Sequence, residues 1–165
     1  SCWMVPEGKS LVGFDASGLE LRMLAHYMND EEFTNVLLKE DIHTRNQMAA
    51  GLDTRPQAKT FIYAFLYGAG DAKIGSIVGG SSGDGRKLKQ RFLRNTPSLE
   101  SLRERVGNAA SRGHLRGLDG RKLWVRSEHA ALNTLLQAAG AIVMKKALVI
   151  ILLRNSQIPS VLILI

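Results

Sequence analysis

The amino-acid sequence predicts a mostly helical α+β fold for this chain of 165 residues. Most of the chain consists of segments in which apolar residues recur every three or four positions, often behind a residue that can cap a helix. Extended segments are few: a short apolar run near the start, and two short runs around the Asp119-Gly120 turn. The length is sufficient for one sizeable core or two small lobes.

The expected elements follow in chain order. A buried strand over 11–15 ends on a carboxylate, Asp15. A loop is expected over 79–83, which consists of Gly and Ser, and a hairpin over 115–126. The spacing of apolar residues predicts helices over 18–28, 31–39, 42–50, 55–67, 71–78, 86–94, 98–110 and 133–153.

The segment 55–68 is the most informative. Its helix places Arg55, Lys59, Tyr63 and Tyr67 four residues apart, so the four side chains share one broad face. Cations bind phosphates, and flat rings contact a base or a sugar, so a nucleoside triphosphate would fit this order. The alternative is an ordinary amphipathic helix with half-buried tyrosines, because apolar residues fill its other side.

The pattern Arg, three residues, Lys, three residues, Tyr, three residues, Tyr-Gly resembles motif B of the family A (polymerase I type) DNA polymerases. The sequence DASGLELR at 15–22 resembles motif A of that family. The run 41–70, from DIHTRNQ through TFIYAFLYGAG, is similar to polymerases of short-tailed phages. The resemblance covers about 10–146, and it implies fingers helices plus part of a polymerase palm. The implied palm segments are 1–30 and 114–165, with the fingers at 31–113.

The resemblance implies roles for motif A. Asp15 would be the first catalytic, metal-binding aspartate, with the carbonyl of Ala16 as a second ligand. Glu20 would be the gate that crowds the sugar 2′ position and rejects ribonucleotides. From the residues alone, Asp15 could instead cap the following helix, and Glu20 could pair with Arg22 on the surface.

For motif B, the resemblance implies that Arg55 and Lys59 hold the triphosphate, with Lys59 also catalytic at the leaving pyrophosphate. His43 would contact the β-phosphate region, although a lone histidine of this kind is more often structural. Tyr63 would pack under the incoming sugar, where its hydroxyl would favour dideoxynucleotides. Tyr67 and Gly68 would lie beside the template base and the end of the duplex.

A third signature begins at Gly120-Arg121 and continues through 126–137. The resemblance implies DNA contacts by Arg121, and minor-groove contacts by Asn133 and Gln137, which can test base-pair geometry without choosing a base. The alternative is a helix cap at Asn133 and a buried amide at Gln137.

The positive charge is concentrated in one block. The net charge is +7, and residues 86–126 hold 12 Lys and Arg against three carboxylates. A nucleic-acid backbone is the commonest partner of such a block, and a solvated surface is the alternative. The lone cysteine, Cys2, excludes an internal disulfide framework, and the longest strongly apolar run, 147–153, is too short to span a bilayer.

The resemblance therefore implies a phage DNA polymerase that works in the cytoplasm of an infected bacterium. It would use two Mg²⁺ ions, dNTPs and a primer–template, and a processivity factor bound through a region upstream. The family's His-Asp-Glu motif is absent from the sequence, so we expect an incomplete polymerase with one of two catalytic aspartates. The alternatives are a non-catalytic module that binds nucleotides and nucleic acid, or a relative of single-subunit RNA polymerases.

Overall fold

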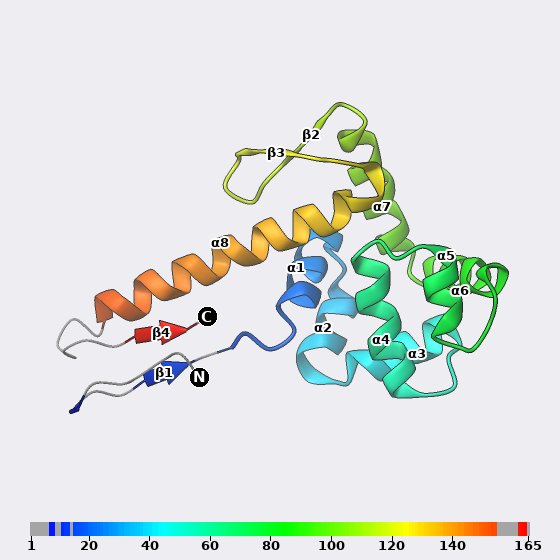
Figure 1. Ribbon diagram of the computed structural model, residues 1–165, viewed down its shortest axis with the longest axis horizontal. Coiled ribbons are helices and arrows are strands. Elements are labelled where there is room, and N and C mark those ends of the chain that lie inside the picture. The colour runs from blue at the N-terminus through cyan, green and yellow to red at the C-terminus, as the bar shows by residue number, and fades with distance from the viewer. Residues whose placement is uncertain (1–6, 9–10, 14, 155–161, 165) are drawn as a thin grey trace.

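The chain folds into a helical body from which one long helix projects (Figure 1). The structure is a computed structural model, and it describes residues 7–8, 11–13, 15–154 and 162–164. The elements in chain order are β1 (Leu11–Gly13), α1 (Leu19–Met28), α2 (Glu31–Lys39), α3 (Ile42–Ala50), α4 (Arg55–Leu66), α5 (Asp71–Ser76), α6 (Ser82–Arg94), α7 (Pro97–Ala110), β2 (His114–Arg116), β3 (Lys122–Trp124), η1 (Glu128–Ala130), α8 (Ala131–Arg154) and β4 (Leu162–Leu164).

The mostly helical α+β prediction is confirmed, and the expected helices form within a few residues of their expected bounds. The largest error lies at α6, which begins at Ser82 rather than at residue 86. The side chain of Ser81 accepts from the backbone of Asp84, and the Asp84 carboxylate bonds back to Ser81. This capping box starts the helix inside a segment that Gly and Ser content assigned to a loop.

Aromatic rings join α4 to α6 within a core that most of the helices share. The ring of Phe92 on α6 meets Phe61 and Phe65 of α4 edge-on, with centroid distances of 5.1 and 5.6 Å. Such edge-to-face contacts add to the burial of the rings and fix how the two helices are rotated. The close approach of α5 and α6 requires Gly85, because a Cβ there would lie 1.9 Å from the carbonyl oxygen of Asp71.

Two small sheets complete the fold. β2 and β3 form an antiparallel hairpin with the register His114↔Trp124, Leu115↔Leu123 and Arg116↔Lys122, as the Asp-Gly turn predicts. β1 pairs in parallel with β4, and Val12 lies opposite Ile163. The expected strand is therefore present over Leu11–Gly13, but Gly13 is exposed and Asp15 lies outside the strand. Phe14, within the expected range, lies outside the described residues.

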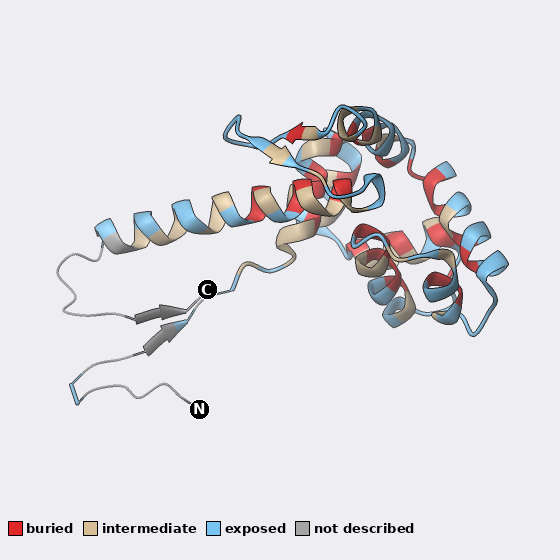
Figure 2. Cartoon of the chain, turned by 45° about the horizontal axis from the view of Figure 1, so that its top comes forward, coloured by how far each residue is buried: buried red, intermediate tan, exposed pale blue. Residues whose placement is uncertain are grey.

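The long helix α8 is buried only over its first half (Figure 2). Leu132, Leu135, Leu136 and Ala139 lie in the core, whereas Leu153 near the other end is 71% exposed. The helical stretch Glu128–Ile151 is long and apolar enough to cross a membrane, so the sequence argument from the shorter run at 147–153 does not hold. This is weak support for a membrane span, because a long core helix meets the same criterion, and the first half of α8 is such a helix.

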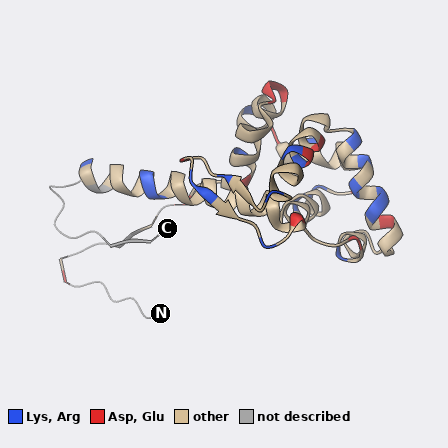
Figure 3. Cartoon of the chain, turned by 90° about the horizontal axis from the view of Figure 1, so that it is seen from above, with Lys and Arg blue, Asp and Glu red and all other residues tan. Residues whose placement is uncertain are grey.

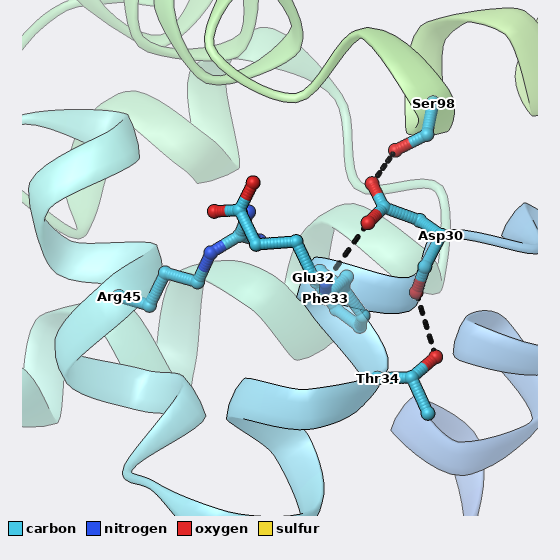
Figure 4. Close-up of polar contacts among 6 residues, drawn as sticks. All are labelled: Asp30, Glu32, Phe33, Thr34, Arg45 and Ser98. Carbon is cyan, nitrogen blue, oxygen red and sulfur yellow. Dashed lines mark hydrogen bonds and ion pairs between the residues drawn. The ribbon is translucent and has the colours of Figure 1, made fainter.

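One carboxylate ties the start of α2 to α7 (Figure 4). Asp30 is the N-cap of α2: its Oδ1 accepts from the backbone N of Phe33 at 2.9 Å, and its Oδ2 accepts from Ser98 Oγ at 2.6 Å. The hydrogen bond from the Phe33 backbone is the largest cause that lowers the pKa of Asp30, and the bond from Ser98 is the second largest. The ionised carboxylate is thus the form that the fold stabilises.

Replacing Asp30 by Ala should lower the free energy of unfolding at pH 7 by about 1–2 kcal/mol, the usual range for a lost N-cap. Because folding lowers the pKa of Asp30, its contribution is present above the pKa of the unfolded chain. It is lost as the pH falls toward the folded-state pKa. Urea unfolding monitored by circular dichroism at pH 7 and pH 3 measures both effects.

The matched control is Asp53→Ala, which removes an exposed carboxylate just before the cap of α4. We expect this control to change stability by less than about 0.5 kcal/mol. Equal losses in the two variants would show that Asp30 contributes only surface charge.

Candidate functional site

Helix α4 presents one apolar face to the core and one polar face outward. Thr54 begins it with a capping box: the Thr54 hydroxyl accepts from the backbone N of Gln57, and the Gln57 side chain accepts from the backbone N of Thr54. The buried residues are Ala58, Phe61, Ile62, Phe65 and Leu66. The four expected site residues lie on the other side: Arg55, Lys59 and Tyr67 are exposed, and Tyr63 is half-buried. Tyr67 is the C-cap residue of the helix.

The first cation of this face, Arg55, is held by Asp41. Arg55 donates from Nε to one carboxylate oxygen of Asp41 and from Nη2 to the other, the latter at 3.1 Å. Asp41 also accepts from the backbone N of His43 at 3.1 Å and from the Thr44 hydroxyl at 2.9 Å. The bond from Arg55 is the largest cause that lowers the pKa of Asp41. Asp41 stands directly before the helix expected over 42–50, and its bond to Arg55 was not predicted from the sequence.

His43 lies between the cations and the rings. Its imidazole is 6.2 Å from the ring of Tyr63, centroid to centroid. Burial lowers the pKa of His43, and the nearby charges of Arg55 and Lys59 lower it further. The charge of Asp41 raises this pKa and offsets part of the shift. The imidazole is therefore neutral at pH 7. Its Nδ1 is buried without a hydrogen-bond partner among the described residues.

The two tyrosines connect α4 to α1. The rings of Tyr63 and Tyr67 lie 6.4 Å apart, and the Tyr67 hydroxyl donates to Glu20 Oε1 at 3.2 Å. Burial raises the pKa of both phenols, and the charge of Glu20 raises them further. Gln137 on α8 has the opposite effect and lowers the pKa of Tyr67. Glu20 thus bonds to Tyr67 and not to Arg22, which donates to the backbone of Ser17.

The end of α4 closely approaches η1. Gly68 has a φ of +76°, and a Cβ at this position would lie 2.7 Å from the carbonyl oxygen of His129. Asn133 and Gln137 follow on α8, one helical turn apart, so they share a face. Asn133 lies inside the helix rather than at its cap, and Gln137 is exposed, so the alternatives of a cap and a buried amide are not observed.

The structure brings Glu20, His43, Arg55, Tyr63 and Tyr67 into one row of contacts. It does not add Asp15 or Arg121 to that row. Asp15 is exposed beyond the end of β1, next to the half-buried Ala16, and it does not cap α1, whose N-cap is Gly18. Among the described residues, no group of three or more His, Cys, Asp and Glu side chains could hold a metal ion. Arg121 pairs with Asp119 in the hairpin turn.

The basic block spreads over α6, α7 and the hairpin (Figure 3). Several of its cations have partners within the chain. Lys89 bonds to Asp71 at 3.0 Å and to the carbonyl of Ala69 at 2.6 Å, and Arg103 lies over the ring of Phe65 at 5.2 Å. Part of the charge that the sequence assigned to DNA therefore stabilises the fold.

A model of DNA polymerase family A matches residues 1–164. The chain belongs to DNA polymerase family A. This match extends past residue 146, where the motif resemblance ends.

The chain is similar to the DNA-directed DNA polymerases of three phages. It is 53% identical to that of Enterobacteria phage T3 and 52% identical to that of Escherichia phage T7, in each case in an alignment 151 positions long that covers 81% of this chain and 21% of the relative. It is 44% identical to that of Escherichia phage Phieco32 in an alignment 182 positions long that covers 88% of this chain and 30% of the relative. This family A chain thus spans about a fifth to a third of the length of these relatives.

Replacing Arg55 by Gln should raise the pKa of His43. The change removes a cation that disfavours the imidazolium, and it releases the Asp41 carboxylate, which favours the imidazolium. Histidine-selective NMR titration of the chain measures this pKa. A control variant, Arg45→Gln, removes a cation of α3 that pairs with Glu32 instead. An unchanged His43 pKa in the Arg55 variant would contradict the placement of His43 beside this cation.

Proposed function

We propose that this chain supplies the part of a template-directed DNA polymerase that binds the incoming dNTP. The observation that carries the proposal is the row on the polar face of α4, from the Asp41–Arg55 pair through His43 and Tyr63 to the Tyr67–Glu20 bond. It offers cations at one end and rings at the other. We propose that 31–113 are fingers, and that 1–30 and 114–165 are palm segments.

The cationic end suits a triphosphate. Arg55 uses Nε and Nη2 for Asp41, and no described residue accepts from its Nη1, which can donate to a second acceptor. Arginine binds phosphate best when its planar fork is already oriented, and Asp41 provides this orientation. Lys59 is exposed one helical turn further along, and His43 is neutral beside it. We propose that Arg55, Lys59 and His43 bind the phosphates, and that Lys59 stabilises the leaving pyrophosphate.

The aromatic end suits a deoxyribose and a base. In this proposal Tyr63 packs under the sugar, and Glu20, held by Tyr67, excludes a 2′-hydroxyl. Tyr67 and Gly68 then lie at the end of the duplex, and Asn133 and Gln137 contact the minor groove, with Arg121 on the backbone. The proposed partners are therefore dNTPs and primer–template DNA, in the cytoplasm of an infected bacterium.

The two Mg²⁺ ions that the family implies fit this chain only in part. The described residues offer the Asp15 carboxylate and the adjacent carbonyl of Ala16, whereas divalent ions of this kind need several oxygen ligands. The ligand set is incomplete within the described residues, so no step of the proposal depends on a metal.

Replacing Lys59 by Ala should weaken dNTP binding to the chain by about tenfold or more, the scale of a lost charge-assisted hydrogen bond. In a chimera that carries residues 10–146 in place of the matching segment of the phage T7 relative, the same change should lower kcat/KM about 10²-fold. Calorimetric titration and single-nucleotide incorporation measure the two effects. Lys39→Ala, an exposed lysine on α2, is the control.

Incorporation by the Lys59→Ala chimera within about threefold of its parent would contradict the assigned role of Lys59. A parent chimera that binds dNTPs yet incorporates none would favour the alternative of a non-catalytic binding module.

Replacing Tyr63 by Phe in the same chimera should leave dNTP incorporation nearly intact and raise discrimination against ddNTPs. Only the hydroxyl changes, and a dideoxy sugar lacks the 3′-hydroxyl that could replace it. The ratio of kcat/KM for dNTP and ddNTP tests this, with Tyr27→Phe on α1 as control. An equal ratio in the variant and its parent would make Tyr63 a packing residue.

A further inference from the structure

The β2–β3 hairpin has one face that packs inward and one that faces solvent. Leu115 is 2% exposed and pairs with Leu123, while the outward pairs are His114↔Trp124 and Arg116↔Lys122. Side chains two residues apart on a strand lie on the same face, so these four residues form one surface, which we call the hairpin face. The proposed dNTP site does not use it.

The two cations of the hairpin face lie directly opposite each other. Like charges in cross-strand pairs destabilise a hairpin unless an anion lies between them. Within residues 114–126, all of which the structure describes, the only carboxylate is Asp119, and it pairs with Arg121. Arg116 and Lys122 have no ion-pair partner among the described residues. The hairpin thus keeps an unfavourable pair of charges that an anionic ligand would relieve.

A large aromatic ring continues the same face. Trp124 is 74% exposed, and its ring lies 5.9 Å from that of His114, tilted by 57°. Exposing an indole to this extent leaves much apolar surface in water. The ring lies two residues along the strand, roughly 7 Å, from Lys122. A ligand that satisfies both features has negative charges and flat, unpaired rings.

We propose that the hairpin face binds single-stranded DNA, with a base stacked on Trp124 and phosphates on Lys122 and Arg116. Stacking on an exposed aromatic beside cations is how proteins hold single strands without reading sequence. A duplex fits less well, because its bases already stack on one another. An acidic peptide would satisfy the charges and leave the indole exposed.

The proposal relies on the proposed function only for the choice of DNA as the nucleic acid. The hairpin proposal and the proposed dNTP site can fail separately, because the dNTP site is on α4 and the hairpin lies against α7 and α8 (Figure 1). Calorimetric dATP binding is measured on every hairpin variant, and we expect it to be unchanged. Loss of dATP binding in the parent chain would overturn the proposed function and leave the hairpin result interpretable.

The experiment uses a Trp3→Phe background, in which Trp124 is the sole tryptophan. A short oligothymidylate should quench the fluorescence of Trp124 as it binds. Trp124→Ala, followed with a labelled oligonucleotide, should weaken binding about tenfold and leave the salt dependence unchanged. Lys122→Gln should reduce the slope of log K against log salt by about 0.7, the value for one lost phosphate contact on a single strand.

Matched controls are Leu118→Ala, an exposed apolar residue in the same hairpin, and Lys39→Gln on α2. Neither control should change the affinity for the oligonucleotide or the slope of log K against log salt. Circular dichroism checks that all variants fold. Equal quenching of the Trp124 fluorescence by a blunt duplex, or by an oligoglutamate peptide, would overturn the proposal. Wild-type affinity for the oligonucleotide in the Trp124→Ala variant would also overturn the proposal.

Discussion

The packing of α4 against α6 is the contact on which the candidate site depends. Phe61 and Phe65 meet Phe92 edge-on, and this arrangement fixes the rotation of α4 about its axis. Once those rings are buried, the residues four apart on the other side must face outward. A rotation of α4 by one residue position would bury Lys59 or Tyr63 and expose a phenylalanine. The polar face of α4 is therefore a consequence of the core.

Contacts with α1 and α3 then position the two ends of this face. Asp41, at the start of α3, orients Arg55, and Glu20, in the first turn of α1, accepts from Tyr67. Each contact joins an exposed side chain of α4 to a carboxylate on another helix, so the site is assembled from three helices. A nucleotide bound along α4 would contact all three helices, so its binding would stabilise their arrangement.

The helical fold and the shared face of the candidate site on α4 could be predicted from the sequence, because both depend on residues close together in the chain. Apolar spacing located α4, and the order Arg55, Lys59, Tyr63, Tyr67 located its face. What could not be predicted depends on residues far apart in the chain. The bond between Asp41 and Arg55 joins two helices across a separation of 14 residues, and charge counting alone could not show that Lys89 pairs with Asp71. The start of α6 was missed because Gly and Ser content outweighed the signal of the Ser81–Asp84 capping box.

Photo-crosslinking of the chain with an azido-dATP, followed by mass spectrometry of the modified peptides, tests most directly whether the polar face of α4 binds the triphosphate and sugar of a dNTP. If it does, adducts will form within residues 41–67, and unlabelled dATP will compete them away. Adducts confined to other parts of the chain, or adducts that dATP does not displace, would contradict it.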